Sequence, residues 1–169
     1  MRGSSGRASL TWSRFDELSP VLLYELLRFR QAIFVVEQNC AYPDLDGLDQ
    51  VAQHLVLRVD DALAGCLRLI PFSDERRIKI GRVAVAEAIR GQGFARTLMQ
   101  EALARCRHDY ADYAVTLTGQ TYLTPFYESL GFAVTSAPYD DYGLRHVDMI
   151  LPAGTARHSG TAEGRARNP

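Results

Sequence analysis

The stretch Arg90-Gly91-Gln92-Gly93-Phe94-Ala95 decides how this chain is interpreted. It lies between a β-branched run, Ile78 to Val85, and an amphipathic helical pattern, Phe94 to Cys106. The two glycines allow the backbone to approach a ligand without the obstruction of a Cβ atom. Successive amides at the start of a helix converge on an anion, and the helix dipole adds positive charge there. The stretch therefore predicts a turn that binds a diphosphate.

Two widespread phosphate-binding motifs do not fit this stretch. A dinucleotide fingerprint that begins at Gly91 would place Arg96 where a small residue should allow close packing of helix on strand. A Walker loop would end in Gly-Lys-Ser/Thr, and this turn does not. A helix start that uses its glycines only for a tight turn stays open as the structural alternative.

A second motif lies downstream at Phe126-Tyr127-Glu128-Ser129-Leu130-Gly131-Phe132. We expect Thr124 to cap a short helix that has Pro125 at its first position. Gly131 should end this helix in the left-handed conformation, with Phe132 folded back onto the last turn. A short buried helix would by itself explain the motif.

In this order, with one strand-like run (113–118) between them, the two motifs resemble those of the GNAT superfamily of acyl-CoA N-acyltransferases. The first family pattern, Arg/Gln-x-x-Gly-x-Gly/Ala, matches Arg90, Gly93 and Ala95. The second places a tyrosine four residues before Gly-Phe, and that tyrosine is Tyr127. The segments 23–30, 34–49 and 143–149 are similar to the ElaA-type branch, so the resemblance extends from about residue 10 to about residue 152.

The order of hydrophobic patterns predicts a mixed α/β (α+β) fold, in which a mostly antiparallel sheet carries helices on both faces. Ser19-Pro20 is expected to start a long helix that ends near Val36, and Asp60-Asp61 to join two strands as a hairpin. The predicted strands are 9–15, 54–59, 63–70, 78–86, 113–118, 132–135 and 144–151. The GNAT resemblance implies that the sheet is splayed open where the cofactor enters.

Length and composition indicate one domain, residues 9–152, with disordered tails at 1–8 and 153–169. A net charge of −1 offers no basic footprint for nucleic acid or an anionic membrane, which favours a small molecule as substrate. The GNAT resemblance implies that this partner is a small-molecule amine or a peptide amine. Cys40, Cys66 and Cys106 have neither zinc-site nor disulfide-scaffold spacing, and no apolar run is long enough to span a bilayer. We therefore expect a cytoplasmic protein, with a homodimer as the hypothesis for its oligomeric state.

The loop 38–50 carries Asp44, Asp46 and Asp49, a pattern that at first suggests calcium. An EF-hand loop that began at Asp44 would need glycine at its sixth position and glutamate at its twelfth, where Asp49 and Leu55 stand. The pattern predicts a solvated acidic loop and no metal site.

The resemblance implies acetyl-CoA as co-substrate. Its pyrophosphate is expected on the amides of Gly91 to Ala95, with Arg90 adding charge, and its pantetheine arm along the backbone of Val83 to Val85. Gln120 stands where the superfamily commonly has an asparagine that contacts the arm, although a polar residue at a strand exit is an equal alternative. The expected cofactor-binding residues are Val83, Ala84, Val85, Arg90, Gly91, Gln92, Gly93, Phe94, Ala95 and Gln120.

Tyr127 is the expected catalytic acid. A phenol with a reference pKa of about 10 stays protonated at neutral pH and can donate to a departing thiolate, whose thiol has a reference pKa of about 8.5. The alternative is a buried tyrosine whose hydroxyl only satisfies a carbonyl. Glu37 follows an apolar run, where burial would raise its pKa and make it a candidate base. A salt bridge to Arg30 or a surface position is the alternative for Glu37.

His54, Asp141 and His146 are expected to contribute to the acceptor site, although each could be structural. The sequence thus predicts an N-acetyltransferase in which a primary amine attacks acetyl-CoA directly. One alternative is an acyl-homoserine-lactone synthase-like transfer, because Arg30, Phe34 and Glu37 resemble a pattern of those enzymes. The other is a non-catalytic module that senses acyl-CoA. The acceptor is not identified by the sequence.

Overall fold

The computed structural model describes residues 7–154, so most of the predicted tails at 1–8 and 153–169 lies outside the described residues. Along the chain the elements are β1 (Ala8–Arg14), α1 (Pro20–Gln31), β2 (Gln53–Val59), β3 (Ala62–Phe72), β4 (Arg77–Val85), α2 (Phe94–Asp109), β5 (Ala114–Gln120), α3 (Thr124–Glu128), β6 (Ala133–Val134), β7 (Tyr139–Asp141) and β8 (Leu144–Leu151). No helix among these residues combines the length and the apolar character needed to cross a bilayer.

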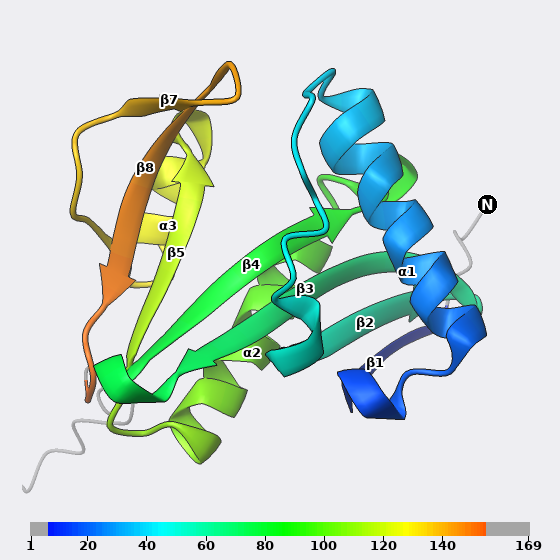
Figure 1. Cartoon of the computed structure of the whole chain (residues 1–169), viewed down its shortest axis with the longest axis horizontal. Coiled ribbons are helices and arrows are strands. Elements are labelled where there is room, and N and C mark those ends of the chain that lie inside the picture. The colour runs from blue at the N-terminus through cyan, green and yellow to red at the C-terminus, as the bar shows by residue number, and fades with distance from the viewer. Residues whose placement is uncertain (1–6, 155–169) are drawn as a thin grey trace, which may run out of the picture.

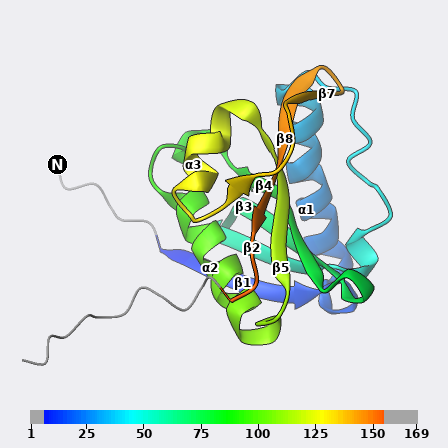
Figure 2. The same ribbon diagram turned by 90° about the vertical axis from the view of Figure 1, so that its left-hand side faces the viewer.

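One strongly twisted sheet runs through the molecule in the order β1-β2-β3-β4-β5-β8-β6, and β7 pairs with β8 beside this path. The pairing of β4 with β5 is parallel, and the other neighbouring strands are antiparallel. Helix α1 covers one face, whereas α2 and α3 lie on the other (Figures 1 and 2). This arrangement confirms the predicted fold class.

The main core lies between α2 and the sheet. Helix α2 buries one stripe of side chains against β2 to β5, as its helical spacing requires: Leu98, Met99, Ala102, Leu103 and Cys106. A smaller core lies under α1, where Leu26 and Ile33 pack with Cys66 and Ala84 of the sheet. Cys66 and Cys106 are therefore core side chains.

Several local signals act as predicted. The side chain of Ser19 accepts a hydrogen bond from the Leu22 amide, and Pro20 occupies the first helical position. The chain then continues from α1 as a π-helix, Ala32–Glu37. Asp60 and Asp61 both have positive φ angles, 48° and 64°, which match the right-handed twist of a tight hairpin.

Helix α3 ends as predicted but begins one residue earlier. Gly131 has a φ of 96°, and the Phe132 amide donates to the Tyr127 carbonyl, which closes the last turn. The prediction that Thr124 caps the helix is wrong, because Thr124 already has helical dihedral angles and its side chain makes no cap. A 3-10 turn, Thr121–Leu123, leads directly into α3 and removes the need for a capping side chain.

The carboxylates of the acidic loop are bound by arginines and are not free in solvent, which corrects the sequence-based expectation. Asp44 and Asp49 are buried, and the Asp46 side chain is 29% exposed. Each of the three binds two guanidinium groups that come from distant elements: Arg30 of α1, Arg68 of β3 and Arg82 of β4. We call these six side chains the Arg–Asp network. Charges that are buried together are tolerated because each is matched by an opposite charge with hydrogen bonds.

Candidate active site

Strands β4 and β5 diverge and open the sheet. They pair only over Arg77–Lys79 and Ala114–Thr116, and beyond this point the two strands separate into a V (Figure 1). A cavity of about 540 Å³ fills the opening. Its lining includes most of the residues that the sequence singled out: Glu37, Val83, Ala84, Val85, Arg90, Gln120, Tyr127, Asp141 and His146.

The glycine turn presents a row of free amides beside this cavity, although residues 91–95 do not themselves line it. Gly91 and Gly93 have φ angles of 75° and 89°, which favour glycine strongly. Within the described part of the chain, the amides of residues 91–96 donate to no acceptor, and the first helical hydrogen bond runs from Thr97 to the Gly93 carbonyl. Free amides at a helix start form an anion site.

Arg90 does not extend over this turn. Its Nε donates to the Val85 carbonyl at 3.0 Å, and its two terminal nitrogens bind the Glu37 carboxylate at 2.6 and 2.9 Å. Arg90 therefore ties the end of β4 to the end of the π-helix. In this geometry the Arg90 guanidinium is already bound to Glu37. It does not extend towards the turn where a pyrophosphate was expected.

The expectation for Glu37 is wrong in one respect. Its side chain is exposed, and the hydrogen bonds from Arg90 lower its pKa in place of the predicted rise through burial. Its partner is also not Arg30, which the Arg–Asp network holds. A carboxylate that is bound at both oxygens by a guanidinium is a poor proton acceptor.

A β-bulge interrupts β4 beside the cavity. Cys66 faces Ala84 and Arg68 faces Gly81, so Leu67 of β3 lies opposite both Arg82 and Val83. Arg82 has a φ of 54°, a strained conformation for a residue with a side chain. The bulge turns the backbone at Val83 on the edge that β5 leaves unpaired.

Three groups hold Arg82 in this conformation. Asp44 accepts from its Nε at 2.6 Å, Asp46 accepts from its Nη2 at 3.2 Å, and its guanidinium carbon lies 4.7 Å from the centre of the Tyr42 ring. The Arg–Asp network thus fixes the backbone that lines the cavity.

Tyr127 lines the cavity and is 7% exposed. Its ring packs edge-on against Phe126 and Phe132. Its hydroxyl makes no hydrogen bond to any residue between 7 and 154, so it does not merely satisfy a carbonyl. Burial raises the pKa of Tyr127 to about 12, which keeps the phenol protonated at neutral pH.

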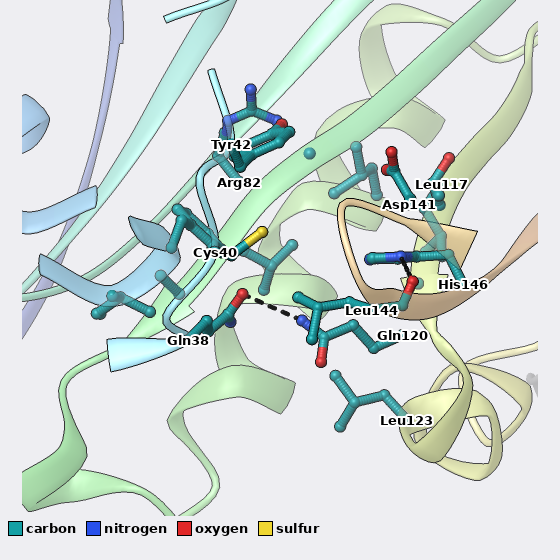
Figure 3. A pocket seen from close by; sticks show the side chains of 18 of the residues that line it. Gln38, Cys40, Tyr42, Arg82, Leu117, Gln120, Leu123, Asp141, Leu144 and His146 are labelled. Carbon is teal, nitrogen blue, oxygen red and sulfur yellow. Dashed lines mark hydrogen bonds between the residues drawn. The ribbon is translucent and has the colours of Figure 1, made fainter. Parts of the chain in front are cut away.

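The amide of Gln120 reaches across the opening. Its Nε2 donates to Oε1 of Gln38 at 3.3 Å, so the end of β5 is linked to the end of the π-helix (Figure 3). Gln120 therefore already has a partner in the protein.

Asp141 and His146 come from the β7–β8 hairpin and lie across the cavity from Tyr42 and Arg82 (Figure 3). Nδ1 of His146 is 2.9 Å from the Leu144 carbonyl oxygen. Because a carbonyl only accepts, Nδ1 carries the proton, and Nε2 of neutral His146 is left with a lone pair.

His54 is not part of this site. It is buried, 2% exposed, and its Nε2 bonds the Asp49 carbonyl at 2.9 Å. Burial lowers the pKa of His54 and keeps the ring neutral. His54 supports the acidic loop. The geometry therefore favours a structural role for His54 over the expected role in the acceptor site.

Some cavity residues were not singled out by sequence reasoning: Gln38, Tyr42, Lys79, Arg82 and Tyr139. Arg82 is recognisable only once the bulge is known, since no propensity places a positive φ at an arginine. Lys79 had a signal, because it is a charged residue inside a β-branched run.

Comparisons with known proteins agree with this geometry. The family described as "Acetyltransferase (GNAT) domain" matches residues 30–152. Protein ElaA of Escherichia coli is 40% identical over 137 residues, which cover 79% of this chain and 90% of that protein. A UPF0039 protein of Synechocystis is 36% identical and covers 83% of this chain and 93% of its own length.

Two solved structures extend the comparison. The crystal structure of Escherichia coli ElaA matches with a TM-score of 0.81 and 37% identity, and covers 85% of this chain and 99% of its own. An acyl-CoA N-acyltransferase from Pseudomonas aeruginosa matches with a TM-score of 0.81 and 35% identity over the same shares. The predicted resemblance, including the ElaA-type branch, is confirmed.

Proposed function

Because the chain belongs to the acetyltransferase (GNAT) family, we propose that it transfers an acetyl group from acetyl-CoA to a primary amine. The observation that carries the proposal is one cavity lined by an unpaired β4 edge and an unbonded tyrosine hydroxyl, with a row of free helix-start amides beyond the end of β4. The buried free cysteines support the expected cytoplasmic location.

The cofactor has a matching place at each end of this arrangement. The pyrophosphate binds the amides of Gly91 to Ala95, where no side chain competes for them. The amide-containing arm pairs with the backbone of Val83 to Val85 like an extra strand. The amide at the bulge, next to strained Arg82, faces the thioester oxygen and stabilises the negative charge that forms on it.

The transfer begins from the ammonium form of the acceptor. Nε2 of His146 takes one proton from it, which frees the lone pair that attacks the thioester carbon, and the nitrogen gives up a second proton to water as the amide forms. When the carbon–sulfur bond breaks, the Tyr127 hydroxyl donates its proton to the departing thiolate. Asp141, on the same hairpin as His146, attracts the ammonium form of the acceptor into the cavity.

Single substitutions test these roles through the release of free thiol from acetyl-CoA with a panel of amines. Tyr127→Phe should lower kcat about 100-fold and leave coenzyme A binding unchanged by calorimetry. Tyr24→Phe, at an exposed tyrosine of α1, is the matched control and should behave like the unmodified protein.

His146→Asn should lower the rate about 100-fold at pH 7. Because a primary amine has a reference pKa of about 10.4, raising the pH should rescue this variant by deprotonating the acceptor directly.

The outcome separates the proposal from its alternative. An acyl-CoA sensor would bind coenzyme A and release no thiol with any amine. A Tyr127→Phe variant with full activity would remove Tyr127 from the mechanism, and a His146→Asn variant without pH rescue would show that the histidine is structural.

A further inference from the structure

Lys79 is the only lysine in a chain that has 18 arginines, and it lies in the cavity. It stands on β4, where this strand still pairs with β5 and Thr116 is its partner. Its neighbours Ile78 and Ile80 are fully buried on the α2 side, so strand alternation points Lys79 to the opposite, cavity face. Gly81, the next residue on that face, leaves room because nothing lies closer than 3.9 Å to the place of a Cβ atom.

The charge of Lys79 is unmatched. No ion pair or hydrogen bond joins its amine to another residue between 7 and 154, and Asp148 attracts it only from beyond ion-pair distance. Two arginines that line the same cavity are in contrast neutralised, Arg82 by the acidic loop and Arg90 by Glu37. Burial lowers the pKa of Lys79, which is the cost of a partly desolvated ammonium without a partner.

An anion that pairs with Lys79 would not be a phosphate of coenzyme A. The phosphate site at Gly91 to Ala95 follows the far end of β4, and the thioester position at Val83 lies four residues beyond Lys79 along the strand. Lys79 is therefore on the acceptor side of the reacting bond.

We propose that Lys79 binds a carboxylate carried by the acceptor, several bonds away from the amine that is acetylated. The inference rests on the proposed acetyl transfer. The distance follows from the strand register: Lys79 faces Thr116 and His146 faces Gln120, so the two positions are separated by about 13 Å along β5. Both residues line the same cavity. A simple α-amino acid is too short to contact both, whereas an extended ω-amino acid or an acidic peptide spans the gap.

A modification experiment tests the carboxylate site without turnover. Because Lys79 is the only lysine, its reductive methylation can be followed by mass spectrometry of one peptide. Saturating hexanoate should slow methylation of Lys79 about tenfold, since a charge-assisted hydrogen bond withdraws the amine. Hexan-1-ol, which lacks the carboxylate, should have no effect, and the N-terminal amine serves as an internal control. Equal rates with hexanoate and hexan-1-ol would overturn the proposal.

Kinetics test the same site with amine acceptors. 6-Aminohexanoate should be acetylated with a higher kcat/KM than hexylamine, and glycine should be the poorest of the three. Lys79→Met should lower kcat/KM for 6-aminohexanoate about 10- to 100-fold and leave that for hexylamine nearly unchanged. Lys79→Arg keeps the charge and should retain most of the preference, which guards against a folding defect in the methionine variant.

The two arms separate the possible failures. If the unmodified protein acetylates both amines equally well and Lys79→Met changes neither, the carboxylate site is refuted and the acetyl transfer stands. If the protein acetylates neither amine, the proposed function is in question, and the protection of Lys79 by hexanoate still decides whether the site exists.

Discussion

At the scale of single residues, Gly119 on β5 determines where the Tyr127 ring can lie. A Cβ atom at Gly119 would be 2.8 Å from Cε2 of Tyr127, closer than van der Waals contact allows. The ring cannot yield easily because Phe126 and Phe132 pack against it. Gly119→Ala should therefore move the hydroxyl, lower kcat at least about tenfold and destabilise the fold by about 1 to 3 kcal/mol.

A double variant identifies the cause of this loss. If Gly119→Ala acts by displacing the hydroxyl, it should lower kcat little further in the Tyr127→Phe background, because the group it displaces is already missing. Additive losses in thiol release would mean that Gly119 affects the cavity by another route.

The sequence predicted the role of a side chain well where the role depends on neighbouring residues. It predicted the role poorly where an ion-pair partner from a distant part of the chain determines it. Ser19 caps its helix and Gly131 closes α3, since both functions depend only on neighbouring residues. Glu37 was expected to be a buried base with a raised pKa. Its partner is Arg90, 53 residues away in the chain, and no local pattern reveals that pairing.

At the scale of elements, the start of α2 depends on a glycine that no other residue can replace without strain. Gly93 precedes the helix with a φ of 89°, and nothing lies within 4 Å of the place of its Cβ atom. Gly93→Ala should cost about 1 to 2 kcal/mol of stability through backbone strain alone. It should also weaken coenzyme A binding at least about tenfold in calorimetry, because the amides of the turn are displaced.

Gly47 offers a matched control on a loop away from this turn. Its φ is 77°, and it too has nothing within 4 Å of a Cβ atom, so Gly47→Ala imposes the same kind of strain. Both variants should lose comparable stability in urea, but only Gly93→Ala should lose affinity. Equal affinities in the two variants would remove the turn from the phosphate site.

Elements were predictable because hydrophobic periodicity is strong in this chain, whereas irregularities within them were not. The strands predicted at 54–59, 63–70 and 78–86 and the apolar stripe of α2 are confirmed. The bulge at Arg82 was not predicted, since its strain is maintained by Asp44 and Asp46 from a loop that the sequence indicated as solvated. Strand β7 was missed because Tyr139–Asp141 is too short for a periodic pattern.

At the scale of the whole molecule, the Arg–Asp network joins α1, the loop 38–50, β3 and β4 into one unit on the cavity side of the sheet. The opposite wall, formed by β5, α3 and the β7–β8 hairpin, meets this unit through few links. These include the short parallel pairing of β4 with β5 and the hydrogen bonds of Gln38 with Gln120 and of Cys40 with the Tyr142 carbonyl. The cavity therefore lies between two groups of elements that are stabilised separately. Residues from both groups line it, so one site is built from segments that are distant in the sequence.

Because of the Arg–Asp network, the free energy of unfolding should decrease as the pH becomes acidic. Arg68 and the Leu48 amide, working against desolvation, lower the pKa of Asp46 from 3.8 to about 2, and Arg30 and Arg68 lower that of Asp49. A carboxylate whose pKa is depressed by folding stabilises the native state above its unfolded pKa and loses this contribution as the pH falls towards the native value. The window for Asp46 is thus pH 3.8 to about 2, and because solvent reaches this side chain and screens its charge, its contribution is about 1 kcal/mol.

Urea unfolding at pH 5 and pH 2.5 tests this directly. The unmodified protein should lose at least about 1 kcal/mol of unfolding free energy between the two pH values, and Asp46→Asn should lose correspondingly less because it starts from a lower value at pH 5. Asp16→Asn is the control, since the Asp16 pair with Arg14 is solvent-exposed, and its profile should follow that of the unmodified protein. If Asp46→Asn and the unmodified protein lost equal stability over this interval, the network would not be the source of the acid sensitivity, and the bulge at Arg82 would need another support.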